Sequence, residues 1–386
     1  MSSDVSSAND AEHHAQVARP SDSQRNTEDL RERLERWMAG KVPAGSVVTV
    51  ADVTLPSANG MSSETILFDA TWDGEHHPLV ARVAPAQSTM PVFPTYDLES
   101  QFRTMAQVRE HSDVPVPSVY WSESDSEALG APFFVMERIT GQVPPDVMPY
   151  NFGSWVSEAT PAQRRTLQDK SVDLLAQLHG IEKPLQRFDF LQLPGSGPTA
   201  REAFSAHIAD QRSFYEWTVA DGVRSPLIER CLDWIEANNP ADDSPAVLCW
   251  GDSRIGNVMY QDFEPVAVLD WEMATLGPRE MDLAWMVFLH RFFEDIAGLA
   301  NLPGLPDFLR IQDVATTYAE LTGYTPADLK YYVTYAALRH ATVMYRIQAR
   351  AIAFGQAETP ADPDDMIMHR ASLTAMLDGT YWERLN

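Results

Sequence analysis

The chain has 386 residues, 44% of them hydrophobic, and its 29 basic and 55 acidic residues give a net charge of −26. Such a length is too great for one small core and predicts two lobes. The negative charge repels nucleic acid and anionic membrane surfaces, so neither is an expected partner, whereas a cationic substrate would be attracted. The sequence has no run of about 18 apolar residues, which argues against a membrane-spanning helix.

The N-terminal residues and the cysteines indicate where in the cell the protein is expected. Residues 1–26 are rich in small polar and charged residues and lack the apolar core of a signal peptide, so we expect a disordered leader. The two cysteines, Cys231 and Cys249, provide neither a disulfide framework nor metal-ligand spacing. We therefore expect a cytoplasmic protein, and the sequence leaves its oligomeric state open.

Residues 27–140 are predicted to form a small lobe rich in strands. A helix pattern begins at Thr27 and stops at Gly40, and Asp73-Gly74 is a hairpin signal. The further predicted elements are strands at 47–53, 64–72 and 77–83, a helix at 97–111, and strands at 118–121 and 133–139. This order suits a five-stranded antiparallel sheet with one helix packed on it.

Residues 141–386 are predicted to form a larger, mostly helical lobe. Pro144 and Pro145 break the chain after Gly141, and Thr160-Pro161 is typical of a helix start. The predicted helices follow the Thr160 start and lie at 201–219, 226–238, 281–297, 311–321 and 329–354. The exception is 246–269, which predicts two short strands around a loop. The expected fold class is therefore α+β, with two lobes.

The stretch 249–273 carries three polar residues at suggestive spacing. The Asp252 carboxylate could orient a substrate hydroxyl and accept its proton, while Asn257 and Asp270 could hold a metal that bridges nucleotide phosphates. A turn at 262–265 between two short strands would bring Asn257 beside Asp270. Each residue alone is typical of ordinary turns. The three together, around one hairpin, predict a phosphoryl-transfer site.

These motifs resemble those of the aminoglycoside phosphotransferase-like kinases, relatives of choline kinases and protein kinases. The resemblance rests on Trp250-Gly251-Asp252, on Asn257 after four further residues, and on Leu269-Asp270-Trp271-Glu272. It implies a bilobal protein-kinase-like fold, ATP or GTP as co-substrate, and Mg²⁺. It also implies that Asp252 is the catalytic base, that Asn257 and Asp270 are the magnesium ligands, and that Asp282 supports the loop. The Asp-Trp-Glu form is most similar to the branch associated with acyl-CoA dehydrogenase-type proteins.

Two departures from the family pattern affect the predicted site. Trp250 stands where the family usually has a histidine that supports the loop. None of the four lysines falls on a predicted strand of the small lobe, and Arg82 takes the place of the phosphate-gripping lysine. An arginine stays charged and can fork onto two phosphate oxygens. The resemblance implies that Glu99 pairs with Arg82, with Asp97 as the alternative.

The remaining nucleotide contacts are expected in the small lobe. The loop containing Gly60, Ser62 and Ser63 would offer N–H groups and hydroxyls to the phosphates, although it is equally typical of an ordinary strand connection. By resemblance, the backbone near Glu137 and Ile139 would bind the adenine edge, in a segment that also reads as a core strand. His179, at the end of a helix, is expected to be structural.

The sequence thus predicts a phosphotransferase that moves the γ-phosphate of ATP or GTP to a hydroxyl of a small molecule, such as an aminoglycoside or a hydroxyacyl compound. The alternative is a nucleotide-binding pseudokinase with a regulatory or scaffolding role, which Trp250 and Arg82 favour. Retention of Asp252, Asn257 and Asp270 favours the enzyme.

Overall fold

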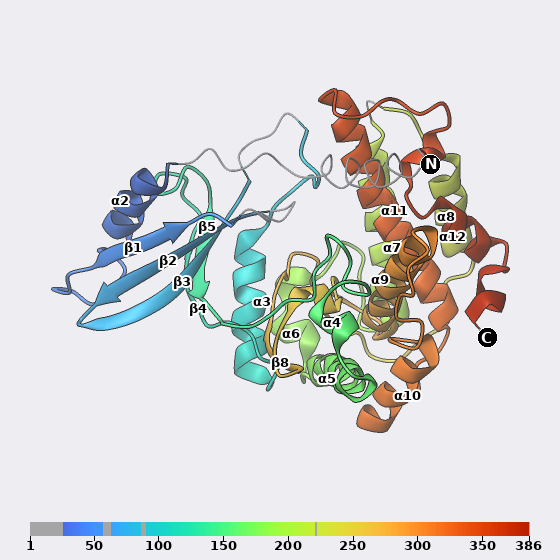
Figure 1. Cartoon of the computed structure of the whole chain (residues 1–386), viewed down its shortest axis with the longest axis horizontal. Helices are drawn as coiled ribbons and strands as arrows, with labels where there is room; N and C mark the ends of the chain where they lie inside the picture. The colour runs from blue at the N-terminus through green and yellow to red at the C-terminus, as the bar shows by residue number, and fades with distance from the viewer. Residues whose placement is uncertain (1–25, 57–62, 86–89, 221, 386) are drawn as a thin grey trace, which may run out of the picture. The chain divides into compact units, whose positions relative to one another are not determined.

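The computed structural model describes residues 26–56, 63–85, 90–220 and 222–385, and the chain divides into two compact units (Figure 1). The first unit holds the described residues up to Arg109 together with Val116–Thr140, and the second holds Glu110–Pro115 and the residues from Gly141 onward. The first is built on an antiparallel sheet and the second is mainly helical. The predicted α+β fold class is confirmed.

The sheet of the first unit has five antiparallel strands in the order β1-β2-β3-β5-β4. The strands are β1 (Thr49–Thr54), β2 (Glu64–Trp72), β3 (Glu75–Val83), β4 (Val119–Glu123) and β5 (Phe133–Glu137). The predicted hairpin is present, and its turn residues Asp73 and Gly74 both have positive φ, 52° and 78°. Such a turn matches the twist of its strands, so the ladder continues up to Trp72 and Glu75.

Two helices, α2 (Thr27–Met38) and α3 (Leu98–His111), cover opposite faces of this sheet. The ring of Trp37 on α2 packs against Phe133, with 4.7 Å between centroids, and Phe102 on α3 packs against Phe134 at 6.2 Å. Successive side chains of a strand point to opposite faces, so the two helices lie on different sides. The sequence predicted only one packed helix. The face of the sheet that carries Phe133 is covered by α2, which buries Leu30, Leu34 and Met38 in the same hydrophobic core as Phe133.

The second unit contains the longer helices, and those predicted from the sequence are confirmed to within a few residues. In chain order the helices are α4 (Trp155–Glu158), α5 (Pro161–His179), α6 (Pro184–Arg187), α7 (Ala200–Thr218), α8 (Pro226–Ala237), α9 (Glu280–Leu299), α10 (Ile311–Thr322), α11 (Leu329–Ala353) and α12 (Arg370–Leu377). Short 3₁₀ turns are η1 (Asp189–Leu191), η2 (Ile255–Asn257), η3 (Pro363–Met366) and η4 (Tyr381–Leu385). No described helix is long and apolar enough to cross a membrane.

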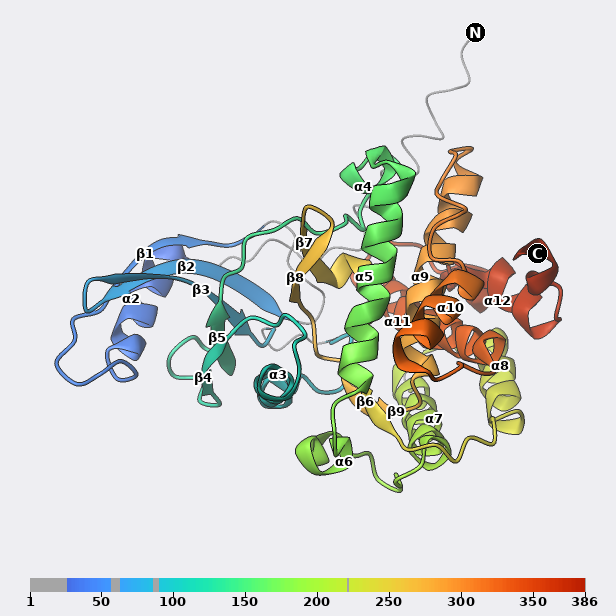
Figure 2. The same cartoon turned by 90° about the horizontal axis from the view of Figure 1, so that it is seen from below.

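Two small β-ribbons frame the predicted site within the helical unit. Strand β7 (Val258–Gln261) pairs with β8 (Glu264–Val268), which confirms the predicted hairpin. Strand β6 (Val247–Cys249) pairs with β9 (Thr275–Gly277), a pairing that the sequence did not predict. Figure 2 shows α5 beside the β7–β8 hairpin, where the hydroxyls of Ser171 and Tyr260 lie 2.8 Å apart. Helices α9 and α11 pack side by side.

Candidate functional site

The β7–β8 hairpin brings Asn257 and the start of the Asp270 loop together. Val258 is paired with Val268, and the N–H of Leu269 donates to the carbonyl oxygen of Asn257 at 2.9 Å. Asp270 is therefore one residue beyond a direct backbone contact with Asn257. Its φ of 59° is a left-handed conformation, in which aspartate and asparagine are among the better tolerated residues. The predicted convergence of the two residues is confirmed.

The Asp252 side chain is held by three donors. Asn257 Nδ2 lies 2.7 Å from Oδ2, and the indole nitrogen of Trp285 lies 2.6 Å from Oδ1. Arg254 Nε is 3.2 Å from Oδ1 and 3.3 Å from Oδ2. The residue is only 9% exposed, so these hydrogen bonds replace most of the water that an exposed carboxylate would bind. Its orientation is consequently fixed by protein groups.

Arg254 links Asp252 to a second carboxylate, Asp146. Its Nη1 donates to Asp146 Oδ2, while its Nε faces Asp252. Burial alone would lower the pKa of the Arg254 guanidinium, but the two carboxylates outweigh burial and raise it. Arg254 is thus a permanent positive charge beside the predicted base. No sequence motif marks Asp146 as a site residue. It only follows the predicted chain break at Pro144 and Pro145.

Trp250, the first departure from the family pattern, supplies a hydrogen-bond donor. Its indole nitrogen lies 3.0 Å from the carbonyl oxygen of Leu269 and 3.1 Å from that of Asp270. The side chain is buried, so both bonds are shielded from water. The indole therefore ties the loop before Asp252 to the loop that carries Asp270.

Asp282 fixes the backbone of the same loop. One carboxylate oxygen accepts from the N–H of Trp250 at 2.7 Å and the other from the N–H of Gly251 at 2.8 Å. Gly251 has a φ of 88°, and a Cβ there would stand 1.9 Å from the carbonyl oxygen of Met273. Only glycine fits this close approach. These contacts agree with the supporting role expected for Asp282.

His179 and Cys249 lie beside Asp282 in a cluster of potential metal ligands. His179 Nε2 is 3.1 Å from Asp282 Oδ2, and its Nδ1 is 2.8 Å from the Tyr318 hydroxyl. Burial raises the pKa of the Cys249 thiol well above its usual value, with the Asp282 charge adding to the effect, and the thiol contacts the carbonyl oxygen of Pro278 at 3.3 Å. A protonated thiol is a poor ligand. The cluster is accounted for as a hydrogen-bond network, and the structural role expected of His179 fits it.

The donor set around Asn257 and Asp270 fits a magnesium ion. Asn257 Nδ2 is directed at Asp252, 2.7 Å from its Oδ2 and 3.2 Å from its backbone oxygen, which turns the amide oxygen of Asn257 away from Asp252. That oxygen and the Asp270 carboxylate are hard ligands of the kind that Mg²⁺ prefers, one or two of them with water and phosphate oxygens completing the shell. The assignment of both as ligands stays a prediction.

Arg82 and Glu99 lie on one face of the sheet of the first unit. The register places Thr65, Arg82, Phe134 and Ser122 in one row across four strands. Arg82 Nη1 donates to Thr65 Oγ1 at 3.2 Å, whereas Glu99 accepts from the Ser122 hydroxyl. Phe134 stands between the two pairs, with neighbouring strands about 4.8 Å apart. The pairing of Glu99 with Arg82 stays a prediction.

The other predicted nucleotide contacts are only partly visible. Gly60 and Ser62 lie outside the described residues. Ser63 is buried, and its hydroxyl has no hydrogen-bond partner among the described residues. The N–H of Glu137 donates to the carbonyl oxygen of Ser118 at 2.8 Å, and the Glu137 carboxylate accepts from the Ser118 hydroxyl at 2.9 Å. Of the two predicted adenine-binding positions, Ile139, which follows the end of β5, is thus the better candidate for a backbone donor.

Comparison with known proteins identifies the family. The model of the phosphotransferase enzyme family matches residues 55–343, which include parts of both units and every predicted site residue. The chain belongs to this family. The resemblance drawn from the site motifs is confirmed, and the protein is a phosphotransferase by family.

Two curated relatives of this phosphotransferase carry acyl-CoA dehydrogenase names. One is the probable acyl-CoA dehydrogenase IBR3 of Arabidopsis thaliana, 24% identical over 314 residues, covering 76% of this chain and 35% of the relative. Another is the human acyl-CoA dehydrogenase family member 11, 30% identical over 177 residues, covering 44% of this chain and 20% of the relative. The chain thus spans about a third or less of the length of these relatives.

A solved phosphotransferase has the same fold. The crystal structure of a thermostable mutant of aminoglycoside phosphotransferase APH(4)-Ia, a ternary complex with AMP-PNP and hygromycin B, has a TM-score of 0.54 and 18% identity. The match covers 89% of this chain and 98% of that one. At this identity the likeness establishes the kinase-like fold of the phosphotransferase.

Proposed function

We propose that this phosphotransferase transfers the γ-phosphate of ATP to a hydroxyl group of a small molecule. The observation that carries the proposal is the Asp252 carboxylate, which is held by Asn257 and Trp285 next to the loop that bears Asp270. A solved family relative was crystallised with AMP-PNP, an ATP analogue, and hygromycin B. GTP remains the alternative donor, to be compared in the same assay.

In this proposal the chain acts mainly by positioning and by charge. Asp252 orients the acceptor hydroxyl and accepts its proton, and its three donors keep it from rotating away. Magnesium, held by Asn257 and Asp270, would neutralise charge on the phosphates when bound. Arg82 would supply a fixed positive charge for the nucleotide, with Glu99 as its predicted partner and the loop with Gly60, Ser62 and Ser63 as a further phosphate contact.

The charges near Asp252 do not by themselves select the acceptor. Arg254 lies between the carboxylates of Asp252 and Asp146, and Arg339 Nη1 is 3.4 Å from the carbonyl oxygen of Gly251. The charge of Asp270 also acts on Arg254, so the carboxylates near the base outnumber these two guanidinium groups. The acyl-CoA dehydrogenase names of the curated relatives favour a hydroxyacyl compound as the acceptor.

The proposal is tested by transfer of labelled γ-phosphate from ATP or GTP to a panel of hydroxyacyl compounds, other hydroxylated metabolites and aminoglycosides. We expect magnesium-dependent labelling of a hydroxyacyl compound. Binding of Mg-ATP without labelling of any acceptor and without ATP hydrolysis would instead support the pseudokinase.

We also propose a cytoplasmic location, since Cys231 and Cys249 are both buried free thiols.

A further inference from the structure

We propose that Trp285 is a positioning residue for phosphoryl transfer, whose indole N–H fixes the orientation of the Asp252 carboxylate. Trp285 lies on α9, three residues after Asp282, and its nitrogen is 2.6 Å from Asp252 Oδ1. From the sequence alone this residue reads as a core aromatic. Its ring is indeed buried, at 4% exposure, but its one polar atom is directed at the predicted base.

The hydrogen bonds to Asp252 leave few free acceptor positions on its carboxylate. A carboxylate offers about four lone-pair sites. Asn257 donates to Oδ2, Trp285 donates to Oδ1, and the single Nε–H of Arg254 is shared between the two oxygens, so the three donors use about three of these sites. Because Trp285 donates to Oδ1 and Asn257 donates to Oδ2, rotation of the carboxylate about χ2 would break both bonds. The carboxylate therefore presents a fixed remaining lone pair to an acceptor hydroxyl.

Trp285 is itself held in place from the neighbouring helix. The Arg339 guanidinium on α11 lies over the indole at 4.8 Å from the ring centroid, a cation–π contact. Arg339 Nη1 also reaches the carbonyl oxygen of Gly251 at 3.4 Å, and the ring of His340 packs edge-on against Trp285 at 6.5 Å. The indole is thus clamped between α11 and the loop that carries Asp252. A group that is held this firmly can set the direction of its hydrogen bond.

This inference rests on the proposed function, because a fixed base matters only if Asp252 receives a hydroxyl proton. Its first test is Trp285→Phe, which keeps an aromatic ring under Arg339 and removes the indole N–H together with one ring of the indole. We expect kcat to fall about 10- to 100-fold with the KM for ATP unchanged, since a misplaced reacting group loses rate and not nucleotide binding. A kcat within twofold of the wild type would overturn the inference.

A double-mutant cycle separates positioning from a general structural role. If Trp285 acts through Asp252, Trp285→Phe should lower the residual rate of Asp252→Asn by less than twofold. A structural role would lower both backgrounds equally, and that result would contradict the inference. The matched control is Trp37→Phe in the first unit, which removes an indole N–H bonded to Glu123 at 3.0 Å and should leave kcat unchanged.

A readout independent of turnover uses the 386-residue chain labelled with ¹⁵N in its ten tryptophans. The Trp285 indole resonance is assigned by its loss in Trp285→Phe. We expect that resonance to shift in Asp252→Asn, because an amide accepts more weakly than a carboxylate. An unchanged resonance would overturn the inference, even if transfer activity is present. Conversely, a shift in a protein that transfers no phosphate would uphold the contact and reject the proposed function.

Discussion

The indole nitrogen of Trp250 lies 3.1 Å from the carbonyl oxygen of Asp270 and 3.0 Å from that of Leu269. Trp250, one of the two departures from the family pattern, therefore joins the two loops of the site. It supplies a hydrogen-bond donor at the position where the family usually has a histidine that supports the loop. The substitution of histidine by tryptophan is thus compatible with an active enzyme, which weakens the case for a pseudokinase.

Trp250→Phe should destabilise the protein by about 1–3 kcal/mol, because it leaves two buried carbonyl oxygens without their donor. It should also raise the magnesium concentration needed for half-maximal turnover, since the loop that carries Asp270 loses its hydrogen bonds to the indole. Urea denaturation and a magnesium titration check the two effects. Trp155→Phe is the control for the lost ring: its indole N–H is buried without a partner among the described residues, so it should cost less than Trp250→Phe. Equal losses in both variants would contradict the account.

Asp270→Asn should abolish the magnesium-dependent part of the thermal shift caused by ATP. Asparagine tolerates the φ of 59° at this position, so the backbone should keep its shape while the ligand charge is lost. Asp262→Asn, at a turn residue of the same hairpin with a φ of 49°, is the control and should keep the full shift. A full shift in Asp270→Asn would remove this residue from the metal site.

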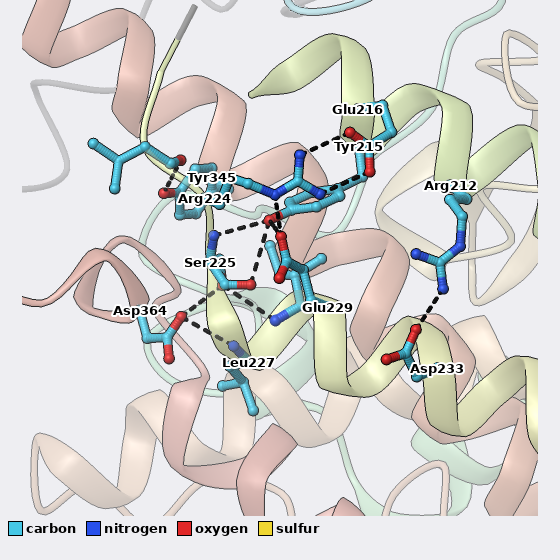
Figure 3. A network of polar contacts seen from close by, with 12 residues as sticks. Arg212, Tyr215, Glu216, Arg224, Ser225, Leu227, Glu229, Asp233, Tyr345 and Asp364 are labelled. Carbon is cyan, nitrogen blue, oxygen red and sulfur yellow. Dashed lines mark hydrogen bonds and ion pairs between the residues drawn. The ribbon is translucent and has the colours of Figure 1, made fainter. Parts of the chain in front are cut away.

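Ser225 and Asp364 hold the start of α8 in a buried polar network (Figure 3). The Ser225 hydroxyl is 2.6 Å from Asp364 Oδ1 and accepts from the N–H of Ile228 at 3.1 Å, while the Tyr215 hydroxyl accepts from the N–H of Ser225 at 2.8 Å. Ser225→Ala removes a helix cap and a partner of a buried carboxylate, and should cost about 1–3 kcal/mol of unfolding free energy.

The control for Ser225 is Ser213→Ala on α7, where the exposed hydroxyl bonds to the carbonyl oxygen of Ala209 at 3.0 Å. A surface substitution of this kind should change stability by less than about 0.5 kcal/mol. Urea denaturation of both variants measures the difference. Similar midpoints for the two would show that the network adds little to stability.

Buried histidines should make the protein less stable as the pH falls below about 6.5. Burial, with the nearby Arg291 charge, lowers the pKa of His290 to about 3, and burial lowers that of His369 to about 4. In the unfolded chain both imidazoles have a pKa near 6.5. Between each folded-state pKa and pH 6.5, the unfolded state therefore binds more protons than the folded state. Each histidine then removes about 1.4 kcal/mol per pH unit across that interval.

Urea midpoints between pH 7 and pH 5 check this dependence, above the range in which carboxylates titrate. The midpoint should fall with pH, and His369→Gln should flatten the slope. His76→Gln, at a histidine whose side chain is 62% exposed, should leave it unchanged. A midpoint independent of pH in this range would show that the buried histidines are protonated in the folded state.

Local patterns in the sequence predicted much of the fold. Helices such as α5 and α9 have apolar stripes or caps within one segment, and the Asp73-Gly74 turn sets its own hairpin. The pairing of β6 with β9 was missed because each strand has only three residues and the pair is far apart in sequence. The short helices α4, α6 and α12 were missed for lack of a periodic pattern.

The site was predicted where its residues are close in sequence and missed where they are not. Asp252, Asn257 and Asp270 share one hairpin, so their spacing carried the information. Trp285 and Asp146 reach Asp252 and Arg254 through tertiary packing, which no local motif reveals. The hydrogen bond that Ser122 donates to Glu99 was missed because the two residues lie on different elements, β4 and α3.

The most direct test of the account is phosphoryl transfer by Asp252→Asn, measured with labelled ATP and the acceptor found in the substrate panel. Asparagine keeps the shape of the side chain but cannot accept the hydroxyl proton. We expect transfer to fall by at least about 100-fold, the usual contribution of a positioned base, while the dissociation constant for Mg-ATP changes less than about threefold. Undiminished transfer by this variant would contradict the assignment of Asp252 as the base.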